Sequence, residues 1–368
     1  MRFPEFSGEW KEEQLDSIAT LSKGIGISKE QLSEDGEPCI LYGELYTKYK
    51  SEIIKHVESK TDIDSSKLKR SKANDVIIPC SGETAVDIAT ARCVPFDNIL
   101  LGGDLNVISL HKYDGAFMSY QLNGKRKYDI ARVAQGVSVV HLYGEHLKAI
   151  KTYNPSLPEQ QKIAELLSLI DERIATQNKI IEKLQSLIKG LRVCCMQRVY
   201  GNNVYLSEIA QIYQPQTISS TELTEDGFLV YGANGIIGKY KDYNHETEQI
   251  CITCRGNTCG MVNYTKPMSW ITGNAMVINT DKYQDKVCKR YLYHYLSAYN
   301  FNSIISGSGQ PQIVRTPLEK LKITLPTISE QKQKAIIFDK IQDKIDINHK
   351  VLNLYIGQKQ YLLRQMFI

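Results

Sequence analysis

The longest regular pattern in the chain is a series of hydrophobic positions spaced alternately four and three residues apart, from Ile163 to Leu191. Every position in this series holds isoleucine or leucine except Gln177. A heptad series places one apolar stripe along an α-helix. The pattern therefore predicts a long helix with a packing seam of roughly 43 Å. Pro155 and Pro158 stand at its start, where proline is tolerated.

The same helix is written a second time further along the chain. At a shift of 171 residues and without a gap, Pro155 aligns with Pro326, and Glu159-Gln160 aligns with Glu330-Gln331. The polar position at the centre of the second seam is Asn348. The predicted seam residues are Ile163, Leu167, Ile170, Ile174, Gln177, Ile181 and Leu184 in the first helix, and Phe338, Ile341, Ile345, Asn348, Leu352 and Tyr355 in the second.

Two such helices in one chain are expected to pack on each other as an antiparallel coiled coil. In that arrangement the seam midpoints meet, so that Gln177 can face Asn348. A buried polar pair of this kind fixes the register of a coiled coil at some cost in stability. The alternative, that both side chains are merely solvated beside the seam, remains open.

The segments that precede the two helices predict strands and short helices. Short β-branched runs beside glycine or proline predict strands at 75–80, 99–103, 249–254 and 275–280. Residues 289–301 predict a helix, and the glycine-rich segments 231–240, 255–260 and 306–312 predict turns and exposed loops. The two segments also match each other loosely, for example Tyr42-Gly43 with Tyr231-Gly232.

The chain is therefore predicted to be an α+β protein with an internal pseudo-two-fold repeat. Two mixed α/β domains, at 1–155 and 201–326, are each followed by a long helical part, at 156–200 and 327–368. Antiparallel pairing of the helices would hold the two domains at a fixed separation in inverted orientation. Double-stranded DNA has the same two-fold symmetry, and one turn measures about 34 Å.

Composition narrows the class of protein without identifying it. The 368 residues are 42% hydrophobic and 23% charged, which is typical of a soluble globular chain and not of a disordered one. The net charge is only +4, so that any DNA binding must come from local patches. The nine cysteines and the absence of a signal-peptide pattern or a long apolar run predict a reducing, cytoplasmic location.

The order of the parts, the PxxxEQ entry to each long helix and the YGxxGxxGxY and RGxxxG loops resemble the specificity (S) subunit of Type I restriction–modification systems, the HsdS family. The resemblance covers the whole chain. It implies a non-catalytic, sequence-specific DNA-binding subunit with two target-recognition domains, each of which reads half of a bipartite site. The first domain keeps only the opening of the loop motif, at Tyr42-Gly43.

The resemblance also implies partners. The helices would set the gap between the half-sites and dock two methyltransferase (M) subunits, and nuclease–translocase (R) subunits would join the full complex. S-adenosylmethionine, ATP and Mg²⁺ are expected only on those partner subunits, with no cofactor in this chain and no membrane partner.

Candidate DNA contacts are Lys/Arg clusters, which suit phosphates, and Arg, Asn or Gln side chains on glycine-rich loops, which suit base edges. In the first domain they are Lys67, Lys69, Arg70 and Lys72, followed by Lys125, Arg126 and Lys127. In the second domain they are Asn234, Lys239, Tyr240, Lys241, Arg255, Asn257, Gln310 and Gln312. For each cluster the alternative is a solvated surface or turn.

No catalytic motif accompanies these residues. The sequence has no GxxxxGK[ST] phosphate loop and no complete Asn/Asp-Pro-Pro-aromatic methyltransferase motif, which disfavours a stand-alone nuclease or methyltransferase. Cys251, Cys254, Cys259 and Cys288 could form a zinc site, but Cys251 and Cys254 fall on a predicted strand and would point to opposite faces. Reduced, buried thiols with no metal are therefore favoured. A second hypothesis is a coiled-coil adaptor that joins two proteins and binds no DNA.

Overall fold

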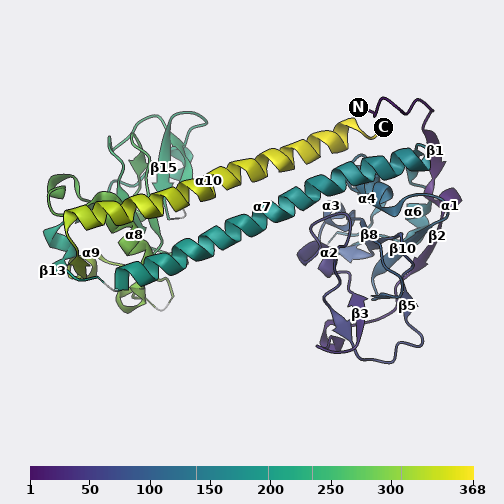
Figure 1. The fold of residues 1–368 in the computed structure, drawn as a ribbon, viewed down its shortest axis with the longest axis horizontal. Helices are drawn as coiled ribbons and strands as arrows, with labels where there is room; N and C mark the ends of the chain where they lie inside the picture. Colours follow the sequence, from purple (N-terminus) through teal and green to yellow (C-terminus); the bar gives the residue numbers. More distant parts are fainter. Residues whose placement is uncertain (138, 198, 234, 308) are drawn as a thin grey trace. The chain divides into compact units, whose positions relative to one another are not determined.

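The computed structural model describes residues 1–137, 139–197, 199–233, 235–307 and 309–368. Two long helices dominate it, α7 (Leu157–Gln197) and α10 (Ile328–Gln365), drawn in teal and yellow in Figure 1. Contacts within the chain divide it into two compact units. One unit comprises Met1–Asn178 with Lys350–Ile368, and the other comprises Lys179–His349, so that both helices contribute to both units.

The first unit contains a four-stranded antiparallel sheet in the order β2-β10-β6-β8. Its inner strands, β6 (Asp75–Pro79) and β10 (Leu105–Leu110), alternate their side chains between two hydrophobic clusters, so that both faces are covered. A second sheet has the order β4-β3-β9-β5. The other strands and α-helices are β1 (Lys11–Gln14), α1 (Leu15–Ile18), β2 (Ala19–Lys23), β3 (Glu37–Ile40), α2 (Glu44–Thr47), β4 (Lys60–Thr61), β5 (Lys69–Arg70), β7 (Ser81–Gly82), α3 (Ala85–Ile88), β8 (Arg92–Val94), β9 (Leu100–Leu101), α4 (Gly115–Asn123), α5 (Lys127–Val133), β11 (Val140–His141), α6 (Gly144–Lys148) and β12 (Lys151–Asn154).

The second unit also contains a four-stranded antiparallel sheet and a second, smaller sheet. Its four-stranded sheet has the order β14-β20-β17-β18, with β17 (Ile250–Thr253) and β20 (Ala275–Asn279) inside. The smaller sheet has three strands, in the order β16-β15-β19. The other strands and α-helices are β13 (Asn202–Tyr205), β14 (Gln211–Tyr213), β15 (Phe228–Gly232), β16 (Gly235–Tyr240), β18 (Val262–Tyr264), β19 (Trp270–Ile271), α8 (Lys289–Ala298), α9 (Arg315–Glu319) and β21 (Lys322–Leu325).

The glutamine of the PxxxEQ motif makes the same contacts in both units. The side-chain oxygen of Gln160 accepts from the Asp114 backbone N–H at 2.9 Å, and its amide donates to the Pro155 carbonyl. Gln331 accepts from the Cys288 N–H at 2.8 Å and donates to the Pro326 carbonyl. Asp114 and Cys288 are the N-cap residues of α4 and α8. The motif therefore fastens each long helix to the helix of its own domain.

Replacing Gln331 by leucine is expected to destabilise the second unit by roughly 2 kcal/mol, because the partly buried Cys288 N–H and the Pro326 carbonyl lose their partner. Gln331 is 1% exposed. Gln333→Leu, which changes an exposed glutamine two residues away on α10, is the matched control and should cost little. Chemical denaturation of both variants measures the difference. Equal stability of the two variants would contradict the fastening role.

Most of the apolar seam residues lie in two hydrophobic clusters, each of which contains residues of both long helices. In the first unit, Ile163, Leu167 and Ile170 of α7 cluster with Leu362 at the end of α10. In the second unit, Leu184 clusters with a group of α10 residues, which are Phe338, Ile341 and Ile345. Ile174 is packed against the first cluster, Ile181 is buried, and Leu352 and Tyr355 are half-buried.

The two polar seam residues lie in different units. Gln177, in the first unit, is buried. Asn348, in the second, is half-buried, and its amide donates to the Lys344 carbonyl one turn earlier at 2.6 Å. The pairing of Gln177 with Asn348 stays a prediction.

Two sequence-based expectations differ from the structure. The segment 231–240 was expected to be turns and exposed loops, but β15 and β16 form a hairpin there, with a register shift between Val230 and Tyr231. The match of Tyr42 to Tyr231 is also wrong by two residues. The Ile40 carbonyl accepts from Gly102, as the Tyr231 carbonyl accepts from Thr272. Tyr231 therefore occupies the place of Ile40, a correspondence that local similarity of two Tyr-Gly pairs concealed.

Within the described ranges, no helix is both long and apolar enough to cross a membrane.

Candidate nucleic-acid interface

Backbone pairing in the second domain joins two of its glycine-rich loops. Arg255 forms a β-bridge with Gln312, and the Gly256 N–H donates to the Pro311 carbonyl at 2.9 Å. The chain turns back at Gly307, whose φ of +94° favours glycine, and a Cβ there would lie 2.4 Å from the Gln310 carbonyl oxygen. Four predicted residues are thus brought together: Arg255, Asn257, Gln310 and Gln312, termed here the second-domain loop edge.

The third glycine-rich loop approaches the same place. The Ala233 carbonyl accepts hydrogen bonds from the hydroxyls of Thr253 and Thr258, which flank Arg255. Asn234, which follows Ala233, lies outside the described residues. Lys239 and Tyr240 are not on this loop, because they occupy the far end of strand β16. Lys239 there pairs with Asp226 at 3.3 Å, and the exposed Lys241 lies over the Tyr240 ring.

The side chains of the second-domain loop edge are available for binding. All four are exposed. Across the described part of the chain, none of these four side chains has a hydrogen-bond or ion-pair partner. Arginine and side-chain amides on backbone-paired loops can present donors and acceptors in fixed positions, which is what reading of base edges requires.

The first domain has an equivalent edge that the sequence did not reveal. Strand β7 pairs with β11, which matches Ser81 with His141, and Leu142 donates to the Cys80 carbonyl at 2.8 Å. In the second domain Ile313 donates to the Cys254 carbonyl in the same way at 3.0 Å. The residues of this first-domain loop edge are Ser81, Glu83, Val139 and His141, in the places of Arg255, Asn257, Gln310 and Gln312.

A short motif could have located the first-domain loop edge. Cys80-Ser81-Gly82-Glu83-Thr84 and Cys254-Arg255-Gly256-Asn257-Thr258 share a C-x-G-x-T pattern directly after an inner strand. No Lys/Arg cluster marks this motif, because its first copy contains no basic residue.

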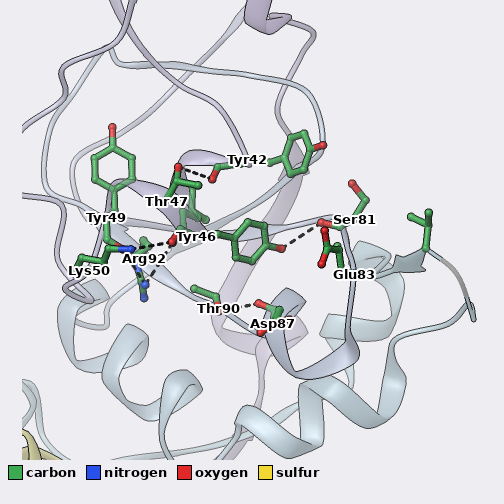
Figure 2. Close-up of a pocket in the computed structure, with 14 residues that line it drawn as sticks. Tyr42, Tyr46, Thr47, Tyr49, Lys50, Ser81, Glu83, Asp87, Thr90 and Arg92 are labelled. Atoms are coloured by element: carbon green, nitrogen blue, oxygen red, sulfur yellow. Dashed lines mark hydrogen bonds between the residues drawn. The ribbon is translucent and has the colours of Figure 1, made fainter. Parts of the chain in front are cut away.

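A cavity of about 730 Å³ opens beside the first-domain loop edge, and Figure 2 shows its lining side chains. The Tyr46 hydroxyl donates to the Ser81 carbonyl at 3.2 Å, which braces the loop, and burial raises the pKa of Tyr46. Arg92 forms one wall, with its guanidinium donating to the Tyr49 carbonyl at 3.0 Å. Burial lowers the pKa of Arg92, and its other hydrogen bonds also go to backbone carbonyls of the same fold.

Comparison with known proteins identifies the family. A family model described as "Type I restriction modification DNA specificity domain" matches residues 7–186 and 202–354, and so includes both domains and most of both long helices. The chain belongs to this family. The match confirms the sequence-based identification as a Type I specificity subunit, the subunit type expected to be non-catalytic.

Individual relatives agree with this assignment. The chain is 31% identical over 147 residues to the EcoprrI specificity subunit of Escherichia coli, which is 39% of this chain and 36% of that protein. It is 25% identical over 331 residues to the MjaVIII specificity subunit of Methanocaldococcus jannaschii, covering 75% of this chain and 74% of that one. The first alignment thus spans only about a third of the E. coli subunit.

Solved structures show the same fold. The crystal structure of the S subunit from M. genitalium matches with a TM-score of 0.70 at 19% identity, covering 100% of this chain and 97% of that chain. A structure from work on complex assembly and conformational transition of the type I R-M system matches with a TM-score of 0.57 at 14% identity, covering 98% and 97%. The mixed α+β architecture with long helices is therefore that of specificity subunits.

The first basic cluster of this specificity subunit is partly used within its own fold. Arg70 donates to Glu37 at 2.6 Å and 3.0 Å and also to Ser65. Hydrogen bonds from Arg70 lower the pKa of Glu37 to about 2. Lys67 and Lys72 are exposed and Lys69 is half-buried. The lysines stay candidates for phosphate contacts, whereas the Arg70 guanidinium is already paired.

The second basic cluster lies beside the end of α10. Arg126 donates to the Ile368 carbonyl at 3.0 Å and pairs with Asp129 at 3.2 Å. Lys127 is half-buried, and burial lowers its pKa. Lys125 is exposed. Arg126 thus joins Ile368 to α5, and a role of this cluster in DNA binding stays a prediction.

The cysteines of the second domain do not converge. Cys251 and Cys254 belong to different hydrophobic clusters, on opposite faces of the sheet. Burial raises the pKa of Cys251 to about 12, which disfavours the thiolate that a metal requires. In the ranges that the structure describes, no group of three or more His, Cys, Asp or Glu side chains is arranged to hold a metal ion.

Proposed function

We propose that this chain is the DNA-recognition subunit of a Type I restriction–modification complex, in which each domain reads one half of a bipartite target. The observation that carries the proposal is the family match to both halves of the chain. Each matched half also contains a loop edge of mostly exposed side chains braced by strand pairing. Because the two edges carry different residues, the two half-sites should differ in sequence.

The long helices supply the proposed spacer and an internal pseudo-two-fold relation between the halves. In support, the glutamine contacts and the hydrophobic seam recur in both units. Antiparallel pairing along the full helices would fix the gap between the half-sites, with Gln177 opposite Asn348 setting the register. On this proposal the domains are 1–155 and 201–326, and the helical parts are 156–200 and 327–368.

The same helices would dock two methyltransferase subunits, to which nuclease–translocase subunits add in the full complex. Both helices expose large apolar side chains that a partner could cover. They are Leu169, Ile180 and Leu187 on α7, and Ile336, Ile337, Ile347, Leu354 and Ile356 on α10. S-adenosylmethionine, ATP and Mg²⁺ would then act on the partner subunits, and this chain would hold no cofactor.

Co-expression with the methyltransferase subunit of its own system, in a methylation-free bacterial host, tests the proposal. Long-read sequencing should detect modified bases in a split motif, with two unlike half-sites around a fixed unread gap. Binding of the purified complex to that motif should weaken steeply with salt, because phosphate contacts release counterions. A stable complex of the two subunits that modifies no DNA would instead favour the protein–protein adaptor.

A further inference from the structure

The two loop edges differ in the chemistry that they offer to DNA. The second-domain loop edge presents an arginine and three amides, which can all donate hydrogen bonds. At the place of Asn257, the first-domain loop edge presents the carboxylate of Glu83. An ionised carboxylate only accepts hydrogen bonds. The corresponding positions must therefore recognise different base edges.

Glu83 is not used to stabilise its own domain. It is exposed, and within the described residues its carboxylate has neither a hydrogen-bond donor nor a cation as partner. Its neighbour Asp87 contrasts with it, because Asp87 accepts from the Thr84 hydroxyl at 2.6 Å. In Figure 2 the Glu83 side chain lies beside Ser81 at the rim of the cavity. Asp87 therefore has a structural role in its domain, whereas no contact gives Glu83 such a role.

The backbone that carries Glu83 is held on both sides. On one side strand β7 is paired to β11, and the Tyr46 hydroxyl donates to the Ser81 carbonyl at 3.2 Å. On the other side Thr84 caps α3, accepting from the Asp87 N–H at 3.1 Å. A charged side chain on so constrained a loop can be presented in a defined position.

A carboxylate at a DNA-binding edge has few possible partners. Phosphate groups repel it, and the base edges of guanine and thymine in the major groove present acceptors. The exocyclic amino groups of cytosine and adenine are the donors available there. Lys23 and Lys50, exposed near the same edge, could supply the cations that contact phosphates on either side.

We propose that Glu83 is a specificity-determining residue that accepts a hydrogen bond from the amino group of cytosine or adenine at one position of the first half-site. This inference rests on the proposed function. On this inference the first-domain loop edge contacts the bases, and the lysines at 67–72 contact phosphates and no bases.

The test is Glu83→Gln in the co-expressed complex, with modification mapped on the host genome. The amide keeps the shape but can donate as well as accept, so that guanine and thymine become acceptable partners. We expect the preference for an amino-bearing base at one position of the first half-site to fall on the order of 10-fold. The second half-site and the gap should not change. Because the preference is a ratio measured within one culture, it does not depend on how much of the variant folds.

Glu58→Gln is the matched control, since Glu58 is an exposed glutamate of the same domain that does not line the cavity. It should leave the motif unchanged. A split motif that Glu83→Gln leaves unaltered would overturn the inference while the proposed function stands. A wild-type complex that yields no split motif would overturn the proposed function and the inference with it.

Discussion

Replacing Lys359 by methionine should destabilise the first unit by about 3–5 kcal/mol, the cost of leaving buried carboxylates without their cation. The Lys359 ammonium lies 2.5 Å from a Glu52 oxygen and 2.6 Å from an Asp171 oxygen. The two carboxylate side chains are only 8% and 6% exposed. Lys359 is on α10, Asp171 on α7 and Glu52 in the first domain, so one cation joins three parts of the unit.

The described cations near these carboxylates include Arg92 and Lys127, and neither forms an ion pair with Glu52 or Asp171. Arg92 is half-buried, and its guanidinium donates to the backbone carbonyls of Tyr49, Leu45 and Ala91. The Tyr120 hydroxyl already donates to Asp171 at 2.7 Å. Loss of the ammonium therefore leaves two negative charges that the surrounding groups only partly neutralise.

Thermal unfolding measures the effect, with an expected fall in Tm on the order of 10 °C. Lys350→Met, at an exposed position of the same helix, is the control and should change Tm little. Adding Glu52→Gln and Asp171→Asn to Lys359→Met removes the stranded charges, and should recover a large part of the loss. If the triple variant is as unstable as the single one, the loss comes from packing and not from charge.

A second large effect is expected from lengthening both helices by one heptad each. Seven helical residues add about 10 Å, which is about three base pairs at ~3.4 Å each. A heptad keeps the apolar seam in phase, so that the folds of the two units should be retained. The modified motif should keep both half-sites but gain a gap of about three more base pairs, and the original motif should no longer be modified.

The insertions belong after Asn178 in α7 and before Lys350 in α10, where the boundary between the units crosses each helix. The control replaces the neighbouring heptads with the inserted sequence without lengthening the helices, and its gap should equal that of the wild type. Modification mapping reads the gap directly. An unchanged gap in the lengthened chain would rule out the helices as the spacer.

The strands and helices that the sequence predicts most accurately are those with a short, local pattern of apolar residues. The predicted strands at 75–80 and 249–254 are β6 and β17, and the predicted helix at 289–301 is α8. The predicted entry to each long helix is likewise observed, at Leu157 and Ile328. These patterns repeat within a few residues, so that neighbouring side chains suffice to specify them. The hairpin β15–β16 was missed because its glycines favoured turns over strands.

The candidate site was predicted only where polar residues sat on glycine-rich loops. Arg255 and Gln312 were both proposed, but their pairing across the bridge depends on strands far apart in sequence. The lysine and arginine clusters follow from the local density of positive charge. Charge density does not distinguish Arg70, which is paired with Glu37, from Arg255, which is exposed. Glu83 is negatively charged, so that a pattern of basic residues does not indicate it.

The sequence by itself determined the two helical seams, the repeated PxxxEQ entry and the family, since all three depend on residue identity and local spacing. Only the tertiary structure decided which side chains are open to a ligand. The first-domain loop edge forms because β7 pairs with β11, some sixty residues later in the chain. Lys359 pairs with Glu52, although most of the chain separates them in sequence. The register of such distant pairing follows from the packing of the whole unit, which no local pattern encodes.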